Sequence, residues 1–296
     1  MPDYFQILIL ALIQGACELL PVSSSAHVIA AEKIMQLDPS SPEMTMLLVM
    51  MHTGTMFSCI VYFWKKWYED YFKIPAKMKS FVLQIIYATV CTLVVGFGLK
   101  IVIEKLFMRD VPHAEVENLF SNLPLIAGAL AAVGIFIIYA GLQEEKLTRE
   151  SEINPIHSCW IGLVQGVCLP FRGFSRSGAT ISTGLILGLS RDKLEEFSFA
   201  LAVVLTPPIV GREALRLIKA HKALAASADP NAVAATNASL AHLFAPGLVG
   251  MVMSFAAGLV ALKLLTRWLE NGLWRYFGYY CLLAACGILA IHYALR

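Results

Sequence analysis

Apolar stretches long enough to cross a lipid bilayer recur along this chain of 296 residues. A helix needs about 20 apolar residues to span the hydrocarbon core, and six segments reach this length. They are 44–64, 81–103, 123–142, 197–217, 243–262 and 276–295. Only 15% of all residues are charged, whereas soluble domains average about 25%. The sequence therefore predicts an all-α polytopic membrane protein with six transmembrane helices, and the bilayer is its expected surrounding.

Charge and cysteine content exclude several other classes of protein. The formal net charge of +2 is too small to predict binding to nucleic acid. The seven cysteines are an odd number, lie in apolar stretches and form no CxxC pair. Neither a disulfide framework nor a zinc site is therefore expected.

Two further pairs of apolar segments are too short to span the bilayer. In the first pair, residues 4–17 are followed by a polar break and a second short run that ends near 35. The second pair, 156–171 and 178–190, has the same form. Broken segments of this kind are tolerated only where they are buried in protein or line a cavity. We therefore expect two re-entrant helical hairpins, within 4–35 and 156–190.

The two broken pairs resemble each other in sequence. Residues 12–17 (LIQGAC) match residues 163–168 (LVQGVC), and a serine-rich break follows each copy. Three spanning candidates follow each pair, and an odd number of crossings makes the two copies inverted in the membrane. The prediction is one integral membrane domain built from an inverted repeat, 1–142 and 153–296. Such repeats place the working site near the midplane, where the breaks meet.

The second break carries the chemistry of an anion site. It contains Ser175, Arg176, Ser177, Gly178 and Thr180, directly before a short helix. A charge at membrane depth is costly unless it is paired or solvated. Hydroxyls, a guanidinium and a helix N-terminus together favour phosphate. In the alternative interpretation, the hydroxyls only cap the helix and Arg176 pairs with Glu18.

The first break carries different groups. It contains Glu18, Ser23, Ser24, Ser25 and His27. A carboxylate, a hydroxyl and an imidazole are the components of nucleophilic or general acid–base catalysis. In the alternative interpretation, the serines cap a helix and His27 bonds to a carbonyl. The two copies are thus similar in backbone and unequal in chemistry: one suits an anion, and the other holds groups that can attack it.

These motifs resemble a known family. Gln14-x-x-x-Glu18, then PVSSSAH at 21–27, and GFSRSGAT at 173–180 resemble the undecaprenyl-pyrophosphate phosphatase family linked to bacitracin resistance, and the resemblance extends along most of the chain. It implies hydrolysis of undecaprenyl pyrophosphate to undecaprenyl phosphate and inorganic phosphate. This reaction would recycle the carrier lipid for cell-wall synthesis, on the outer, periplasmic face of the bacterial inner membrane, and would give bacitracin resistance.

The resemblance and the residues together give a candidate site. The expected catalytic residues are Glu18, Ser24, His27 and Arg176. The expected substrate-binding residues are Gln14, Ser23, Ser25, Ser175, Ser177, Gly178, Thr180 and Arg172. Arg172 stands where the family usually has proline, so it either adds a second cation beside the phosphates or extends toward the interface and only packs.

Two points of chemistry stay open in the sequence. Either Ser24 is the nucleophile, activated by His27 or Glu18, or these two groups position a water molecule. His27 lies one helical turn beyond Ser24, and this spacing favours a Ser24–His27 pair. Glu18 is also a candidate ligand for Mg²⁺ or Ca²⁺. His52 lies within a span, where an ionisable group suggests a function, although a satisfied core histidine has the same pattern.

A carrier for polyprenyl phosphate is the alternative function. It would use the same repeat and anion site without chemistry, and the catalytic groups found in one copy alone favour the enzyme. Lysines cluster at 65–79, so the positive-inside rule places this loop in the cytoplasm and the termini outside. The oligomeric state stays open, with a homodimer as one alternative.

Overall fold

The computed structural model describes residues 2–38, 42–107, 119, 122–144, 152–226 and 230–294, and this part of the chain is helical without a strand. The elements are α1 (Tyr4–Leu19), α2 (Ser24–Ile34), α3 (Pro42–Trp67), η1 (Tyr68–Phe72), α4 (Pro75–Val102), η2 (Ile103–Phe107), α5 (Leu123–Glu144), α6 (Pro155–Val167), α7 (Arg176–Ile186), α8 (Arg191–Ala226), α9 (Pro230–Glu270) and α10 (Trp274–Ala294).

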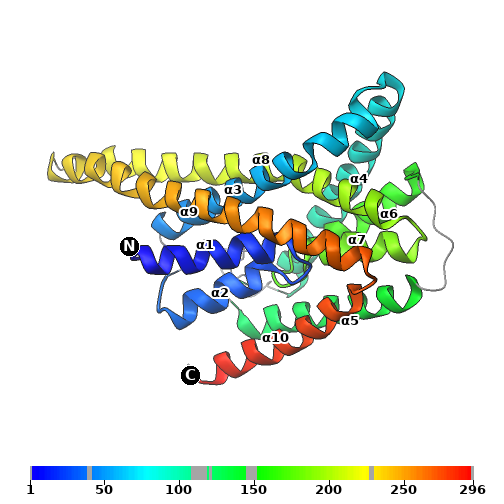
Figure 1. The fold of residues 1–296 in the computed structure, drawn as a ribbon. Helices are drawn as coiled ribbons and strands as arrows, with labels where there is room; N and C mark the ends of the chain where they lie inside the picture. The colour runs from blue at the N-terminus through cyan, green and yellow to red at the C-terminus, as the bar shows by residue number, and fades with distance from the viewer. Residues whose placement is uncertain are drawn as a thin grey trace.

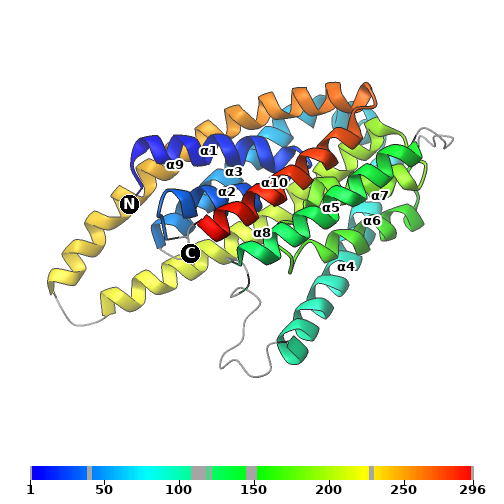
Figure 2. The ribbon, with the colours of Figure 1, turned by 90° about the horizontal axis from the view of Figure 1, so that it is seen from below.

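Six of these elements are long and apolar enough to cross a membrane, as the sequence predicts. The spans are Met44–Phe72, Pro75–Lys105, Leu123–Gln143, Arg191–Arg212, Ala245–Glu270 and Trp274–Ala294. The prediction of a polytopic all-α membrane protein is confirmed. Both ends of the chain lie toward the same end of the helix bundle (Figures 1 and 2), as an even number of crossings requires.

The remaining four helices are short, with 16 residues in α1, 11 in α2, 13 in α6 and 11 in α7. Serine caps begin the second helix of each pair. The Ser23 hydroxyl accepts from the Ala26 amide, and the Ser175 hydroxyl accepts from the Gly178 amide. Each cap satisfies one backbone donor that a helix start leaves open. The helical pairs lie where the sequence places them, whereas their re-entrant course and the inversion of the two repeats stay predictions.

The fourth span passes through Pro207 and Pro208 without ending. A double proline is expected to kink a helix, and α8 continues from Arg191 to Ala226 as one element through both prolines (Figure 1). Because proline lacks an N–H group, the carbonyls four residues earlier, of Val203 and Val204, lose their helical donors. These two carbonyl oxygens therefore lack a donor within the helix, and Val203 lies beside the candidate site.

Close helix contacts hold the short helices against the spans. Helix α1 packs on α9, and α6 packs on α4. A Cβ atom added to Gly15 would lie 2.5 Å from the Ser254 carbonyl oxygen of α9. A Cβ atom added to Gly166 would lie 2.9 Å from the Thr92 carbonyl oxygen of α4. Small residues let helix backbones approach this closely within a membrane. Gly15 and Gly166 occupy matching positions of the repeated LxQGxC motif. Helix α5 also runs along α10 (Figure 2).

Candidate active site

The two polar breaks of the sequence are in contact in the structure. The Ser177 hydroxyl donates to the Leu20 carbonyl oxygen at 3.2 Å, and the Gly173 amide donates to the Ser25 hydroxyl at 3.3 Å. These bonds join the turn before α2 to the turn before α7. Motifs about 150 residues apart in the sequence thus form one site.

The shape of both turns depends on left-handed backbone. Ser23 has φ of 67° and Gly173 has φ of 102°. A Cβ atom on Gly173 would lie 2.4 Å from the Ile126 carbonyl oxygen, so both the angle and the space require glycine there. Ser23 holds a conformation that costs a non-glycine residue free energy, and such strain persists only where surrounding contacts enforce it.

The Glu18 carboxylate lies at the centre of the site. Its Oε1 accepts from Arg176 Nη2 at 2.5 Å, and its Oε2 accepts from the Ser24 hydroxyl at 2.5 Å. Gln14 Nε2 donates to Oε2 at 3.1 Å from one helical turn earlier. One carboxylate of α1 therefore joins a hydroxyl of α2 to a guanidinium of α7. The ion pair between Arg176 and Glu18, left as an alternative by the sequence, is present.

Gln14 contributes a second polar atom beside this carboxylate. Its side chain is fully buried, and its Oε1 has no hydrogen-bond partner among the described residues. Buried polar atoms are nearly always paired, so an acceptor without a partner at the edge of the site suits a substrate hydroxyl or a water molecule. Substrate binding by Gln14 stays a prediction.

The predicted Ser24–His27 pair is wrong. His27 Nδ1 lies 2.8 Å from the Ser23 carbonyl oxygen, and its Nε2 lies 2.8 Å from the Tyr280 hydroxyl. A carbonyl oxygen only accepts, so Nδ1 carries the hydrogen and the Nε2 of the neutral ring accepts from Tyr280. Both nitrogens are therefore occupied, and the Ser24 hydroxyl turns to Glu18 instead. Sequence spacing alone gave no sign of Tyr280, which lies 253 residues away.

Removing the Tyr280 hydroxyl tests whether His27 positions α2. We expect Tyr280→Phe to lower kcat/KM for phosphate release about 3- to 10-fold, the range for one modest hydrogen bond. The stacked ring, whose centroid lies 5.6 Å from that of His27, would remain. Tyr279→Phe changes the neighbouring exposed tyrosine and should leave the rate unchanged. A loss of several hundredfold in Tyr280→Phe would show that the hydroxyl takes part directly in the reaction.

The hydroxyls around Arg176 hold α7 in place. Ser175 caps the helix through the Gly178 amide, as described above. Thr180 donates to the Arg176 carbonyl oxygen at 2.9 Å, and its Oγ1 lies 2.6 Å from the Ser198 hydroxyl of α8. The sequence did not single out Ser198. Phosphate binding by Ser23, Ser25, Ser175, Ser177, Gly178 and Thr180 stays a prediction, because their contacts stabilise the two turns.

Arg172 lies in the turn before α7 and is half-buried. Its positive charge acts on the Glu32 carboxylate of α2, and the Glu32 residue is only 3% exposed. A buried carboxylate needs such compensation. Arg172 therefore compensates a buried carboxylate near the end of α2, and its predicted contact with phosphate is untested.

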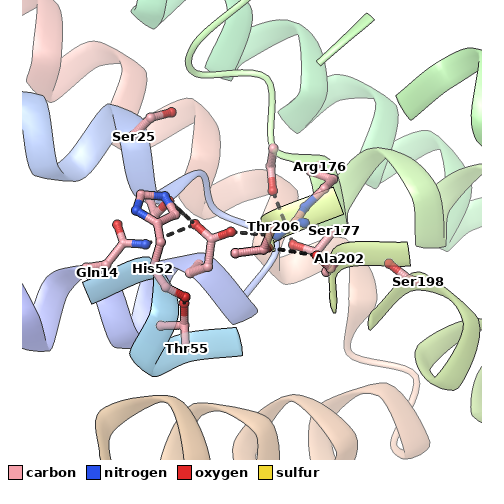
Figure 3. Close-up of polar contacts among 12 residues, drawn as sticks. Gln14, Ser25, His52, Thr55, Arg176, Ser177, Ser198, Ala202 and Thr206 are labelled. Atoms are coloured by element: carbon pink, nitrogen blue, oxygen red, sulfur yellow. Dashed lines mark hydrogen bonds and ion pairs between the residues drawn. The ribbon is translucent and has the colours of Figure 1, made fainter. Parts of the chain in front are cut away.

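His52 is the second imidazole near the carboxylate. Its Nδ1 lies 2.8 Å from the Leu48 carbonyl oxygen, and its Nε2 lies 3.7 Å from Glu18 Oε2. His52 of α3 and Arg176 of α7 reach the cluster from opposite sides (Figure 3). The expectation of a function for an ionisable residue within a span therefore has a structural basis, since His52 neighbours Glu18.

A cavity adjoins this cluster. Glu18, Leu19, Thr55, Met56, Cys59, Arg176, Ala202, Val203 and Thr206 line it. Its wall combines one carboxylate, one guanidinium and two hydroxyls with apolar side chains from α3 and α8. This combination places polar and apolar side chains together beside the carboxylate. Thr55 and Thr206 were not identified from the sequence.

Glu18 is the predicted ligand for Mg²⁺ or Ca²⁺. No group of three or more histidine, cysteine or acidic side chains suited to a metal occurs within the described ranges. Glu18, the predicted ligand, already binds the Arg176 guanidinium at 2.5 Å, and that cation repels a second one beside it. Glu18 therefore belongs to no cluster of three such side chains in the part of the chain that the structure describes, and the predicted role of a divalent ion is untested.

Comparison with known proteins places the chain in a family. The model of the family described as "Bacitracin resistance protein BacA" matches residues 7–287. Undecaprenyl-diphosphatase 2 of Acinetobacter baylyi is 52% identical over 280 residues, which cover 95% of each chain. Undecaprenyl-diphosphatase of Bacteroides fragilis is 31% identical over 297 residues, which cover 98% of this chain and 97% of that protein. The resemblance found in the motifs is thus confirmed, and the chain belongs to the BacA bacitracin resistance protein family.

Proposed function

We propose that this membrane protein hydrolyses undecaprenyl pyrophosphate to undecaprenyl phosphate and inorganic phosphate. The central observation is that Glu18 binds Ser24 and Arg176 through different carboxylate oxygens. A hydroxyl next to a base is the arrangement of an activated nucleophile. A guanidinium next to it can hold the phosphate that the nucleophile attacks. The names of the relatives support the choice of lipid.

The first step is attack by Ser24. Its oxygen forms a bond to the terminal phosphorus, its proton moves to Glu18 Oε2, and the bond to the bridging oxygen breaks. Undecaprenyl phosphate leaves as an anion. Arg176 has five N–H donors, and its contact with Glu18 leaves others for the oxygens of the transferred phosphoryl group. Electrostatic stabilisation of this kind often contributes more to catalysis than any other single effect.

The second step is hydrolysis of the phosphoserine. Water adds to phosphorus, the bond to the Ser24 oxygen breaks, and this oxygen regains its proton from Glu18. His27 takes no proton in this scheme. It holds the first turn of α2, which carries Ser24, against Tyr280 of α10.

The helix contacts support an inverted repeat that divides the chain into 1–142 and 153–296. If α6 corresponds to α1 and α4 corresponds to α9, the α1–α9 contact has its counterpart in the α6–α4 contact. The packing glycines, Gly15 and Gly166, fall at equivalent positions. In this arrangement the short helix pairs are re-entrant, and their two polar turns meet within the membrane.

We further propose that the site opens to the outer face of the inner membrane. The lysine cluster at 65–79 supports an orientation with the termini outside, by the positive-inside rule. Release of the monophosphate lipid there would return the carrier to cell-wall synthesis. Removal of the pyrophosphate lipid would also give bacitracin resistance.

Detergent-solubilised protein mixed with undecaprenyl pyrophosphate tests the function directly. We expect release of inorganic phosphate in proportion to enzyme concentration. A parallel assay in liposomes follows movement of fluorescent undecaprenyl phosphate between leaflets. Lipid movement without phosphate release would contradict the enzyme and establish the carrier.

The proposed role of a divalent ion has its own test. Because no cluster of three or more acidic, histidine or cysteine side chains occurs within the described ranges, we place Mg²⁺ or Ca²⁺ on the pyrophosphate group of the substrate. Exhaustive chelation should therefore lower phosphate release, and added Mg²⁺ should restore it, while calorimetry of the lipid-free protein should detect no saturable binding. Undiminished release after chelation would remove the ion from the reaction, and saturable binding would place it on the protein.

A further inference from the structure

The two proposed steps of the reaction do not involve the His52 imidazole. Its Nε2 lies 3.7 Å from Glu18 Oε2, the oxygen that accepts from Ser24. On α3 it precedes Thr55, Met56 and Cys59, which line the cavity beside Glu18, by three, four and seven residues. These spacings place all four side chains on one face of the helix. His52 is therefore on the cavity side of α3, and Figure 3 shows it opposite Arg176.

The hydrogen bond to Leu48 determines which nitrogen of His52 is basic. The carbonyl oxygen of Leu48 only accepts, so Nδ1 at 2.8 Å carries the hydrogen. In the neutral ring, Nε2 then has a lone pair and faces Glu18. No hydrogen bond from the described residues reaches this atom. The Nε2 of His27, in contrast, already accepts from Tyr280.

The chemistry of the second step needs a proton acceptor of this kind. After the first step Glu18 holds the proton of Ser24, because a departing phosphate anion takes none. A protonated carboxyl group cannot accept the proton of the attacking water. General bases are recognised by their reach to the proton that they remove. His52 Nε2 lies 3.7 Å from Glu18 Oε2 and accepts no hydrogen bond from the described residues.

We propose that His52 Nε2 accepts the proton of the water that hydrolyses phospho-Ser24. This inference rests on the proposed function and adds a base for its second step. Water oxygen bonds to phosphorus, one water proton moves to Nε2, the phosphorus–Ser24 bond breaks, and Glu18 returns its proton to Ser24. The His52 side chain is 35% exposed, so the helix bundle does not enclose it completely. Histidine is suited to such transfers near neutral pH.

His52→Gln tests the proposal, because glutamine keeps a polar side chain without a proton acceptor of comparable basicity. Rapid mixing with undecaprenyl pyrophosphate should give a burst of about one equivalent of undecaprenyl phosphate at the wild-type rate. Phosphate release should follow about 10²-fold more slowly, the usual loss of a general base. Acid quenching should trap phosphate on Ser24. Imidazole added to His52→Ala should restore part of the slow step.

His292→Gln, near the end of α10, is the matched control and should behave as wild type. Turnover of His52→Gln within threefold of wild type would overturn the proposal. A slow variant without a burst or without phosphoserine would overturn it as well, because His52 would then act on another step or on the fold. Failure of the proposed function looks different, since wild-type protein would then release no phosphate.

Discussion

Arg176→Lys is expected to lose about 99% of kcat/KM for phosphate release while the protein still inserts and folds. The planar guanidinium can bind Glu18 and two phosphate oxygens together, whereas an ammonium offers a single point of charge. Loss of one such contact in the transition state costs about 3 kcal/mol, or roughly 10² in rate. Lysine retains a positive charge near Glu18, so the carboxylate is not left buried without a partner, which would cost about 3–5 kcal/mol of stability.

The control for this variant is Arg191→Lys. Arg191 donates to the Glu270 carbonyl oxygen at 2.9 Å at the exposed start of α8, outside the cluster. Its replacement should leave both phosphate release and thermal unfolding unchanged. Activity of Arg176→Lys near that of wild type would reduce Arg176 to a structural partner of Glu18.

The spans could be predicted from the sequence because bilayer thickness fixes their length. Each of the six apolar stretches coincides with a long helix of the structure. The continuation of α8 through Pro207 and Pro208 could not be predicted from segment length. Missing donors within a membrane are tolerated where neighbouring groups satisfy the backbone, and those neighbours are a property of the packed fold.

The residues of the candidate site could be predicted from the sequence, but not which of them form hydrogen bonds or ion pairs with one another. Glu18, Ser24 and Arg176 were each identified from motifs, and the structure places them in one cluster. Spacing along a helix suggested Ser24 with His27, because only local neighbours are visible in a sequence. The partners that decide the pairing, Tyr280 on α10 and Glu18 on α1, come from other elements. A motif shared with a family identifies which residues belong to the site, whereas tertiary packing determines which of their atoms form hydrogen bonds.

For His52, the sequence gave a reason to expect a function but not the contacts that support one. A histidine within an apolar span was already a reason to expect a function, because an ionisable group in a membrane is costly. The sequence could not state which of its ring nitrogens carries the hydrogen, because that depends on the Leu48 carbonyl. It could not state its neighbour either, since Glu18 lies on a different helix.

Ser24→Ala is expected to reduce phosphate release to background, a loss of at least about 10³-fold, because the nucleophile is removed. The hydrogen bond from the Ser24 hydroxyl to Glu18 Oε2 at 2.5 Å supports this role, since it points the hydroxyl proton at the oxygen that would accept it. The Arg176–Glu18 pair remains in the variant, so lipid binding should persist. The measurement is phosphate release by purified protein, with acid-quenched wild-type enzyme analysed for phosphate on Ser24.

A water nucleophile predicts a different result for the same variant. Ser24 would then only donate a hydrogen bond, and its loss, about 1.4 kcal/mol, would leave roughly a tenth of the rate. Ser80→Ala, at an exposed serine of α4, controls for the loss of a hydroxyl and should match wild type. Residual activity near a tenth, with no phosphate trapped on Ser24, would replace the covalent route by direct attack of water. Background activity in Ser24→Ala together with a trapped phosphoserine would assign the attack to Ser24, with Glu18 as its base.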